Sequence, residues 1–431
     1  MEYVCDVLIV GAGLAGMSTA LELDSNLNII LISNDKLDKC NSYLAQGGIT
    51  TVLDEKDLEL FVRDTMKAGS YTNDEKVVRM VGEKSNKSIE KLISYGVDFN
   101  RDEKGNLKYT REAAHSTNRI LYSNDTTGKE IWEKLAIELK KRKNITLMED
   151  VSLIDLIKEN NKAYGAIGLK NNETNIFYYK KIVMACGGIG GLFKASTNYE
   201  NIKGIGLAIA FRHNIKLKNI DCIQLHPTAF YSTCERRRFL LTESLRGEGA
   251  KLIDDLGEQF IDELMPRDFV SQGILEHKKK RQIPCVLLDA RHLGEQYIIN
   301  RFPKIYNYLK EQGIDISHQP VPVAPCQHYF MGGIEVDLRG RSSMENLYAC
   351  GEVSCTGLHG NNRLASNSLL EASVFSLEVA NDINNNISKE IIKKIPYKEI
   401  NLENLEKENM ASLIKELAKT REDLRDELLD Y

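Results

Sequence analysis

The stretch that decides the fold stands near the start of the chain and reads Val7-Leu8-Ile9-Val10-Gly11-Ala12-Gly13-Leu14-Ala15-Gly16. Its first four residues are apolar and predict a short buried strand, and the segment from Leu14 to Leu23 predicts a helix. Gly11 is expected to make the tight turn, Gly13 to let backbone approach a pyrophosphate, and Gly16 to let helix and strand pack closely. With a second apolar strand at residues 28–32, the pattern predicts a dinucleotide-binding unit whose phosphates meet a helix N-terminus.

The second strand lacks the acidic residue that usually binds a ribose hydroxyl in such a unit. Ser33, Asn34 and Asp35 stand at its end. Three alternatives stay open at this point: Ser33 or Asn34 could contact the ribose, or Asp35 could reach it from just beyond.

Composition narrows the possible functions. A length of 431 residues predicts two or three domains at about 150 residues each. The formal net charge of −5 argues against a nucleic-acid surface, which needs a basic excess. The chain has no run of about 18 apolar residues, so we expect no membrane helix. Its first residues show no signal-peptide pattern. The nine cysteines form no CxxC pair, so we expect a reduced, cytoplasmic protein without a metal site.

Further elements can be read along the chain. Residues 181–188 predict a buried strand that ends in paired glycines, and residues 347–352 have the same character. Between them, histidine, arginine and glutamate gather in residues 220–325, as expected of a domain that holds polar substrate groups. We expect helices in 54–100, 128–141 and 366–382, and strands in 145–157, 164–169 and 336–338. The charged tail is expected to form one apolar stripe from Leu402, Leu405, Met410, Leu413, Leu417 and Leu424.

Longer motifs follow in a fixed order and carry a resemblance. They are Ala45-Gln46-Gly47-Gly48-Ile49, Leu225-His226-Pro227-Thr228-Ala229, residues 241–250 (LTESLRGEGA), Pro266-Arg267-Asp268, His328-Tyr329 before Gly332-Gly333, and Gly351-Glu352-Val353 leading to residues 357–371 (GLHGNNRLASNSLLE). With the segment from Gly11, they make the chain resemble the flavoprotein family of succinate dehydrogenase and fumarate reductase.

The resemblance implies the fold class. It is an α/β fold with a Rossmann-like FAD-binding domain in two sequence pieces, an inserted α+β capping domain and a short helical C-terminal tail. The implied boundaries are 1–219 and 331–385 for the two pieces of the FAD-binding domain, 220–330 for the capping domain, and 386–431 for the tail. The active site would lie where the two domains meet.

Two positions place the chain within the family by resemblance. Where quinone-linked members carry a histidine bonded to FAD, this chain has Asn41, so FAD is expected to be noncovalent. In the aspartate-oxidising branch a glutamate faces the substrate ammonium group, and Glu112 in Thr110-Arg111-Glu112-Ala113-Ala114-His115-Ser116 takes that position. An anionic group is what a dicarboxylate site would add to tell aspartate from succinate.

The resemblance also assigns the substrate site. Arg267 matches the proton donor and acceptor of the family, although an arginine is an unusual base because its pKa lies above about 12. Arginine is suited to gripping a carboxylate bidentately. The positions that match the substrate-binding residues are Glu112, His226, Thr242, Glu243, His328, Arg363 and Ser366. Glu243 and Arg246 are expected either to supply a proton path or to fix Arg267.

The cofactor contacts are likewise carried over by position. They are Gly11, Ala12, Gly13, Leu14, Ala15, Gly16, Asn34, Asn41, Ser42, Tyr43, Leu44, Ala45, Gln46, Gly47, Gly48, Val151, Glu352, Ser368 and Leu369. Two features depart from the family. Ile205 stands where an acid is usual, and only about 50 residues follow the last motif, where relatives carry a three-helix domain.

The leading hypothesis for function is oxidation of L-aspartate to iminoaspartate by hydride transfer to flavin N5. The resemblance makes this the first step of NAD biosynthesis through quinolinate, with oxygen or fumarate as acceptor and quinolinate synthase as a possible transient partner. The alternative is a soluble fumarate reductase or succinate-oxidising flavoenzyme, and a flavin-bound module without turnover is a third hypothesis.

Overall fold

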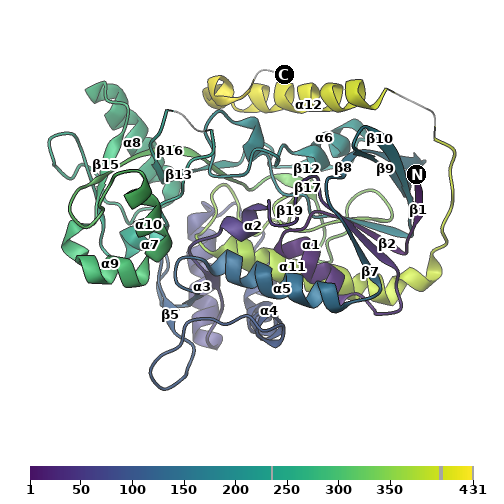
Figure 1. The fold of residues 1–431 in the computed structure, drawn as a ribbon, viewed down its shortest axis with the longest axis horizontal. Coiled ribbons are helices and arrows are strands. Elements are labelled where there is room, and N and C mark those ends of the chain that lie inside the picture. The colour runs from purple at the N-terminus through teal and green to yellow at the C-terminus, as the bar shows by residue number, and fades with distance from the viewer. Residues whose placement is uncertain (234–235, 398–400, 430–431) are drawn as a thin grey trace.

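The structure of the protein is a computed structural model, and it describes residues 1–233, 236–397 and 401–429 (Figure 1). Its centre is a five-stranded parallel sheet in the order β18-β11-β2-β3-β7. The strands are β2 (Val7–Val10), β3 (Ile29–Ile32), β7 (Ile145–Met148), β11 (Lys181–Met184) and β18 (Leu347–Ala349). The four strands other than the edge strand β7 are buried along their whole length, because other layers cover both faces of the sheet.

Alternating side chains of β2 enter different cores. Val7 and Ile9 pack in the same core as residues of α1 (Leu14–Glu22), α5 (Thr127–Lys141) and α11 (Asn367–Asn386). Leu8 and Val10 point the other way and pack with a second sheet. That sheet has the order β1-β10-β9-β8 and consists of β1 (Glu2–Val4), β8 (Ser152–Glu159), β9 (Lys162–Lys170) and β10 (Glu173–Tyr178).

A second lobe, drawn in green at the left of Figure 1, has its own core. Its antiparallel sheet runs in the order β13-β16-β15-β14, with β13 (Ile223–Phe230), β14 (Lys251–Ile253), β15 (Val286–Asp289) and β16 (Val321–Phe330). Helices α7 (Glu243–Gly247), α8 (Arg267–Arg281), α9 (Glu295–Arg301) and α10 (Pro303–Glu311) complete it. The fully buried residues of this core all lie between Phe230 and Val323. The domain boundaries given above stay a prediction.

Shorter elements connect these layers. They are α2 (Asn41–Leu44), β4 (Ile49–Thr50), α3 (Glu55–Ala68), α4 (Glu75–Ser94), β5 (Tyr109–Thr110), β6 (Ile120–Leu121), α6 (Ile205–Arg212), β12 (Leu217–Lys218), β17 (Gly333–Glu335) and β19 (Ser354–Cys355), with 3-10 turns at Gly190–Leu192, Arg291–Leu293, Ile387–Lys389 and Glu422–Glu427. The helices expected in 54–100, 128–141 and 366–382 are confirmed.

Two strand predictions were wrong in detail. Residues 145–157 form two strands in different sheets, because Asp150 has a left-handed backbone (φ 60°) that breaks the run. The strand expected at 336–338 lies instead at Gly333–Glu335. Asp337 ends it, since its carboxylate accepts the backbone N–H groups of Arg339 and Arg341 and so forms a turn.

The C-terminal segment forms one long helix, α12 (Leu402–Thr420), above α6 (Figure 1). The predicted apolar stripe is confirmed, since all six of its residues are buried. Leu402 and Leu405 pack with residues of β8, β9 and β10, whereas Met410, Leu413 and Leu417 pack with residues of α6. Within the described ranges, no helix is long and apolar enough to cross a membrane.

The packing of α12 predicts the effect of one truncation. Leu413 is 3% exposed, so Leu413→Ala leaves a cavity and should lower the free energy of unfolding by about 2–5 kcal/mol. Lys415→Ala, at an exposed position of the same helix, is the matched control and should change it by less than about 0.5 kcal/mol. Urea unfolding measures both variants, and equal values would contradict the packing described.

Candidate functional site

A deep cleft lies between the carboxyl ends of the central strands and the second lobe. It holds about 1590 Å³ of free space, including the part that opens to solvent. The predicted residues that line it are Gly11, Ala12, Gly13, Ala15, Asn34, Asn41, Ser42, Leu44, Ala45, Gln46, Gly47, Gly48, Glu112, Val151, His226, Thr242, Glu243, Arg267, His328, Glu352, Arg363, Ser366, Ser368 and Leu369. Segments far apart in sequence therefore meet in one cleft, as the motifs predicted.

Three of the predicted cofactor residues do not line the cleft. Leu14 and Gly16 are buried inside α1, and a side chain at Gly16 would overlap the carbonyl group of Gly11. Tyr43 points to the other side of α2, where its ring packs edge-on against Trp132 with centroids 5.5 Å apart. Gly16 thus has the packing role expected of it, and the Tyr43 side chain belongs to a different surface.

The first end of the cleft has the form of a dinucleotide cradle. Gly11 has φ 114°, and a β-carbon there would overlap the carbonyl group of Ala185, so β2 and β11 approach as only glycine allows. The N-cap of α1 is Gly13, which has no side chain to cap the first turn, and Oγ of Ser42 accepts the N–H of Leu14 at 3.0 Å. Such a helix end binds a pyrophosphate, so the chain fits FAD at this position.

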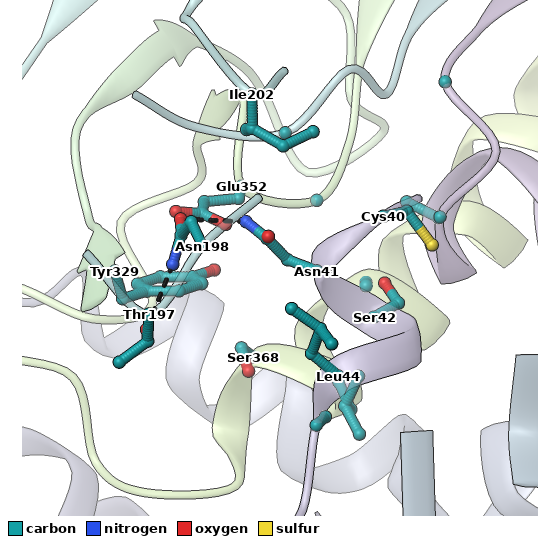
Figure 2. A pocket seen from close by; sticks show the side chains of 18 of the residues that line it. Cys40, Asn41, Ser42, Leu44, Thr197, Asn198, Ile202, Tyr329, Glu352 and Ser368 are labelled. Carbon is teal, nitrogen blue, oxygen red and sulfur yellow. Dashed lines mark hydrogen bonds between the residues drawn. The ribbon is translucent and has the colours of Figure 1, made fainter. Parts of the chain in front are cut away.

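The middle of the cleft is lined by amides and a carboxyl group. Asn41 donates from Nδ2 to Oδ1 of Asn198 at 2.8 Å, and its own Oδ1 accepts the N–H of Tyr199 at 3.2 Å. Glu352 accepts the backbone N–H of Phe330 at 3.1 Å. Figure 2 shows Asn41, Asn198 and Glu352 directed toward one another. Gln46 has a buried Oε1 without a partner among the described residues, which leaves an acceptor for a ligand.

The far end of the cleft gathers buried cations. Arg267 donates from Nε to Glu243 and from Nη1 to Oε1 of Gln224 at 2.9 Å. Arg363 donates from Nη2 to Nε2 of His328 at 3.1 Å and from Nη1 to Oγ of Ser368 at 3.1 Å. The rings of His328 and His226 lie 5.0 Å apart, edge to face. Two guanidinium groups and two imidazoles therefore surround one end of the cleft.

Burial and the neighbouring charges shift the pKa values of the groups in this cluster. Burial and then the nearby Arg267 lower the pKa of Arg363 to about 10. Burial and the same arginine hold the pKa of His226 and of His328 well below the ordinary value, so both imidazoles are neutral. Burial acts to raise the pKa of Glu243, but the two arginines beside it outweigh burial and lower it. Glu243 is thus ionised and partly balances the cations.

Several donors in the cluster have no partner. Nδ1 of His226 accepts the backbone N–H of Thr228 at 3.2 Å, which leaves Nε2 as the protonated nitrogen. That Nε2 and Nε of Arg363 are buried and unpaired among the described residues. Unsatisfied buried donors are costly, and an anionic ligand would satisfy them. The arrangement is suited to binding carboxylate groups.

Glu112 brings the opposite charge to this end of the cleft. It is 3% exposed, and burial, followed by repulsion from Glu243, raises its pKa. Its loop is fixed by the fully buried Arg119, which pairs with Asp57 and Asp64 of α3 at 2.9 Å each. The structure therefore places a buried carboxyl group in the same part of the cleft as the buried cations, where it can meet a cationic group of a ligand.

Among the residues that sequence reasoning missed are three that form hydrogen bonds with predicted site residues. Thr197 binds Nδ1 of His328 at 2.7 Å, Asn198 binds Asn41, and Gln224 binds Arg267. Thr197 and Asn198 stand in an irregular loop without a periodic signal. Gln224 lies two residues before His226 on β13, so period-2 alternation was a signal that could have identified it.

Within the described ranges, no group of three or more His, Cys, Asp or Glu side chains could hold a metal ion.

Comparison with known proteins agrees with this geometry. Residues 6–369 match a family model described as an FAD binding domain. The chain is 48% identical over 433 residues to L-aspartate oxidase of Clostridium perfringens, covering 100% of this chain and 98% of that protein. It is 39% identical to L-aspartate oxidase of Pseudomonas aeruginosa, covering 89% of this chain and 75% of that protein.

Solved structures show the same fold. A quinol-fumarate reductase with menaquinol molecules aligns with a TM-score of 0.85 and 27% identity, covering 99% of this chain and 78% of that one. An E. coli quinol fumarate reductase aligns with a TM-score of 0.84 and 27% identity, covering 96% of this chain and 75% of that one. The predicted fold class is confirmed. The chain belongs to the FAD-binding flavoprotein family of succinate dehydrogenase and fumarate reductase, and within it to the L-aspartate oxidases.

Proposed function

We propose that the protein uses noncovalently bound FAD to oxidise L-aspartate to iminoaspartate, the first step of NAD biosynthesis through quinolinate. The observation that carries the proposal is the buried Glu112 carboxylate beside Arg267, Arg363 and the two neutral histidines. A cleft with these groups can bind two carboxylates and one ammonium group at once. The names of relatives at 48% and 39% identity support the same reading.

The residues of the chain divide into two sets. The glycine turn at Gly11–Gly13, the backbone of 45–48, Asn41 and Glu352 would hold FAD, whose isoalloxazine ring supplies the acceptor for a hydride from the substrate carbon. Asn41 has an amide with no nucleophilic nitrogen, so this position offers no covalent link. Backbone and uncharged groups thus do most of the cofactor binding.

The second set would hold the substrate. Arg363 and His226 would donate hydrogen bonds to carboxylate oxygens, and Thr242 would add a hydroxyl at the same wall. His328 accepts from Arg363 through Nε2 and so holds that guanidinium group in place. Glu112 receives the ammonium group. Binding of both carboxylates and the ammonium group would fix the Cα–H bond in one orientation. Such orientation is a large part of what substrate binding contributes to the rate of hydride transfer.

We assign proton exchange to Arg267. Oxidation of an ammonium substrate to an iminium product releases one hydride from carbon and one proton from nitrogen, so the cleft needs a proton acceptor. Glu243 and Gln224 bind Nε and Nη1 of Arg267 and so fix the plane of the guanidinium group. As a guanidinium, Arg267 has no free lone pair, so it can accept the substrate proton only as its own Nε proton passes to the ionised Glu243 carboxylate that it contacts.

The remaining roles of the protein are also proposals. Fumarate or oxygen would reoxidise the flavin, since a site for one dicarboxylate can admit another. Quinolinate synthase would take the unstable imine product. The eight described cysteines are free thiols, which supports a reducing, cytoplasmic location. Succinate oxidation, the alternative function, would leave Glu112 without a cationic partner.

Anaerobic reduction by L-aspartate tests the function. The FAD-loaded protein should lose its flavin absorbance with L-aspartate and respond weakly to succinate. Glu112→Gln removes the charge that binds ammonium, so it should raise KM for L-aspartate roughly 10- to 100-fold. Bleaching by succinate alone would assign the protein to the succinate-oxidising alternative.

Glu352 makes the stability of the FAD-free protein depend on pH. Its removal from water in the cleft wall raises the pKa of its carboxyl group from 4.5 to about 7. Between these values the unfolded chain releases a proton that the folded chain keeps. The contribution of Glu352 to the free energy of unfolding is therefore fully present below pH 4.5 and is lost as the pH rises to about 7. Unfolding by urea across this range should show the fall, and Glu352→Gln should reduce it. An unchanged slope in the variant would refute the assignment.

A further inference from the structure

Serine hydroxyls from two different parts of the fold hold the two oxygens of the Glu112 carboxylate. Ser244 of α7 donates to Oε1 at 3.1 Å, and Ser366, at the N-terminus of α11, donates to Oε2 at 2.6 Å. We propose that Ser244 is a positioning residue for substrate selection, whose hydroxyl orients the Glu112 carboxylate for the substrate ammonium group. This inference rests on the proposed oxidation of L-aspartate.

The hydroxyl of Ser244 is itself oriented. The Thr242 hydroxyl lies 3.5 Å from Oγ of Ser244, and the Ser244 backbone N–H donates to the Thr242 hydroxyl at 3.4 Å. The nearer acceptor for the Ser244 proton is Oε1 of Glu112 at 3.1 Å, so this proton is directed to Glu112 and the Thr242 proton stays available to a ligand. Because Thr242 lines the carboxylate end of the cleft, Ser244 links the residues that would bind the two ends of the substrate.

The two serines belong to different lobes. Leu241 and Leu245, on either side of Ser244, are part of the core of the second lobe. The backbone of α7 lies directly on the Glu112 segment, since a β-carbon at Gly247 would be 3.1 Å from the carbonyl oxygen of Arg111. Glu112 is thus fully held only while the second lobe rests on the first. Recognition of the ammonium group then requires the closed arrangement.

The charges around Glu112 explain why it needs two donors. Burial and the neighbouring Glu243 favour its neutral form, whereas Arg267 and the two serine hydroxyls favour the ionised form. Without Ser244, one buried oxygen would lose its donor, and the ionised carboxylate would be less stable. A protonated Glu112 cannot balance an ammonium group. Loss of the Ser244 hydroxyl should therefore affect substrates that carry this group and leave others unchanged.

Ser244→Ala, compared with wild type and Ser244→Thr, tests the inference. The alanine variant should raise KM for L-aspartate about tenfold, with a smaller change in kcat. The acid limb of its kcat/KM profile should move to higher pH. The dissociation constant for fumarate, which has no ammonium group, should stay unchanged when followed through the flavin spectrum. Ser244→Thr keeps the hydroxyl and should restore the wild-type KM.

The outcomes separate this inference from the function on which it rests. If L-aspartate does not reduce the wild-type flavin, the proposed function fails. If L-aspartate reduces the wild-type flavin but Ser244→Ala keeps the wild-type KM, the positioning role is overturned. It is also overturned if Ser244→Ala weakens the binding of L-aspartate and of fumarate equally. A threonine variant as impaired as the alanine variant would also overturn it. If the alanine variant does not retain FAD, Ser244→Cys, with a weakly donating thiol, takes its place.

Discussion

The site depends on the burial of several positive charges close together. Arg246, Arg267 and Arg363 are all buried, and Glu243 is the acid in direct contact with two of them. Burial, followed by repulsion from Arg267, lowers the pKa of Arg363 and keeps the nearby imidazole of His226 neutral. Like charges buried together are costly. The fold holds them because each is fixed by neighbours, and an anionic ligand would remove most of the cost.

The architecture follows from this requirement. The first lobe supplies a rigid sheet and a glycine turn that place a cofactor, and the second lobe supplies Arg267, Glu243 and His226. Neither lobe forms the site alone. Glu112, the residue proposed to select the substrate, lies where α7 of the second lobe contacts the first lobe, so binding and selection would depend on the same contacts. A site that assembled differently could bind a dicarboxylate without distinguishing an amino acid.

Sequence reasoning reached the fold class, and all but three of the site residues that it named line the cleft, because long motifs tie chemistry to fixed positions. It failed where tertiary geometry decides. Asp150 breaks a strand that periodicity predicts to continue, since one left-handed residue redirects the chain into another sheet. Tyr43 belongs to a four-residue helix, so its neighbours line the cleft while its own ring faces Trp132. Gln224 is uncharged and was not among the predicted site residues, although it binds Arg267.

One measurement tests the central claim that the buried cations bind both carboxylates of a dicarboxylate ligand. Fumarate and crotonate have nearly the same shape, but a methyl group replaces one carboxylate in crotonate. Their dissociation constants for the FAD-loaded protein can be measured through the flavin spectrum at one pH and ionic strength. The account predicts that fumarate binds at least about 100-fold more tightly, because each buried charged hydrogen bond contributes about 1.5–3 kcal/mol. Equal affinities would contradict it.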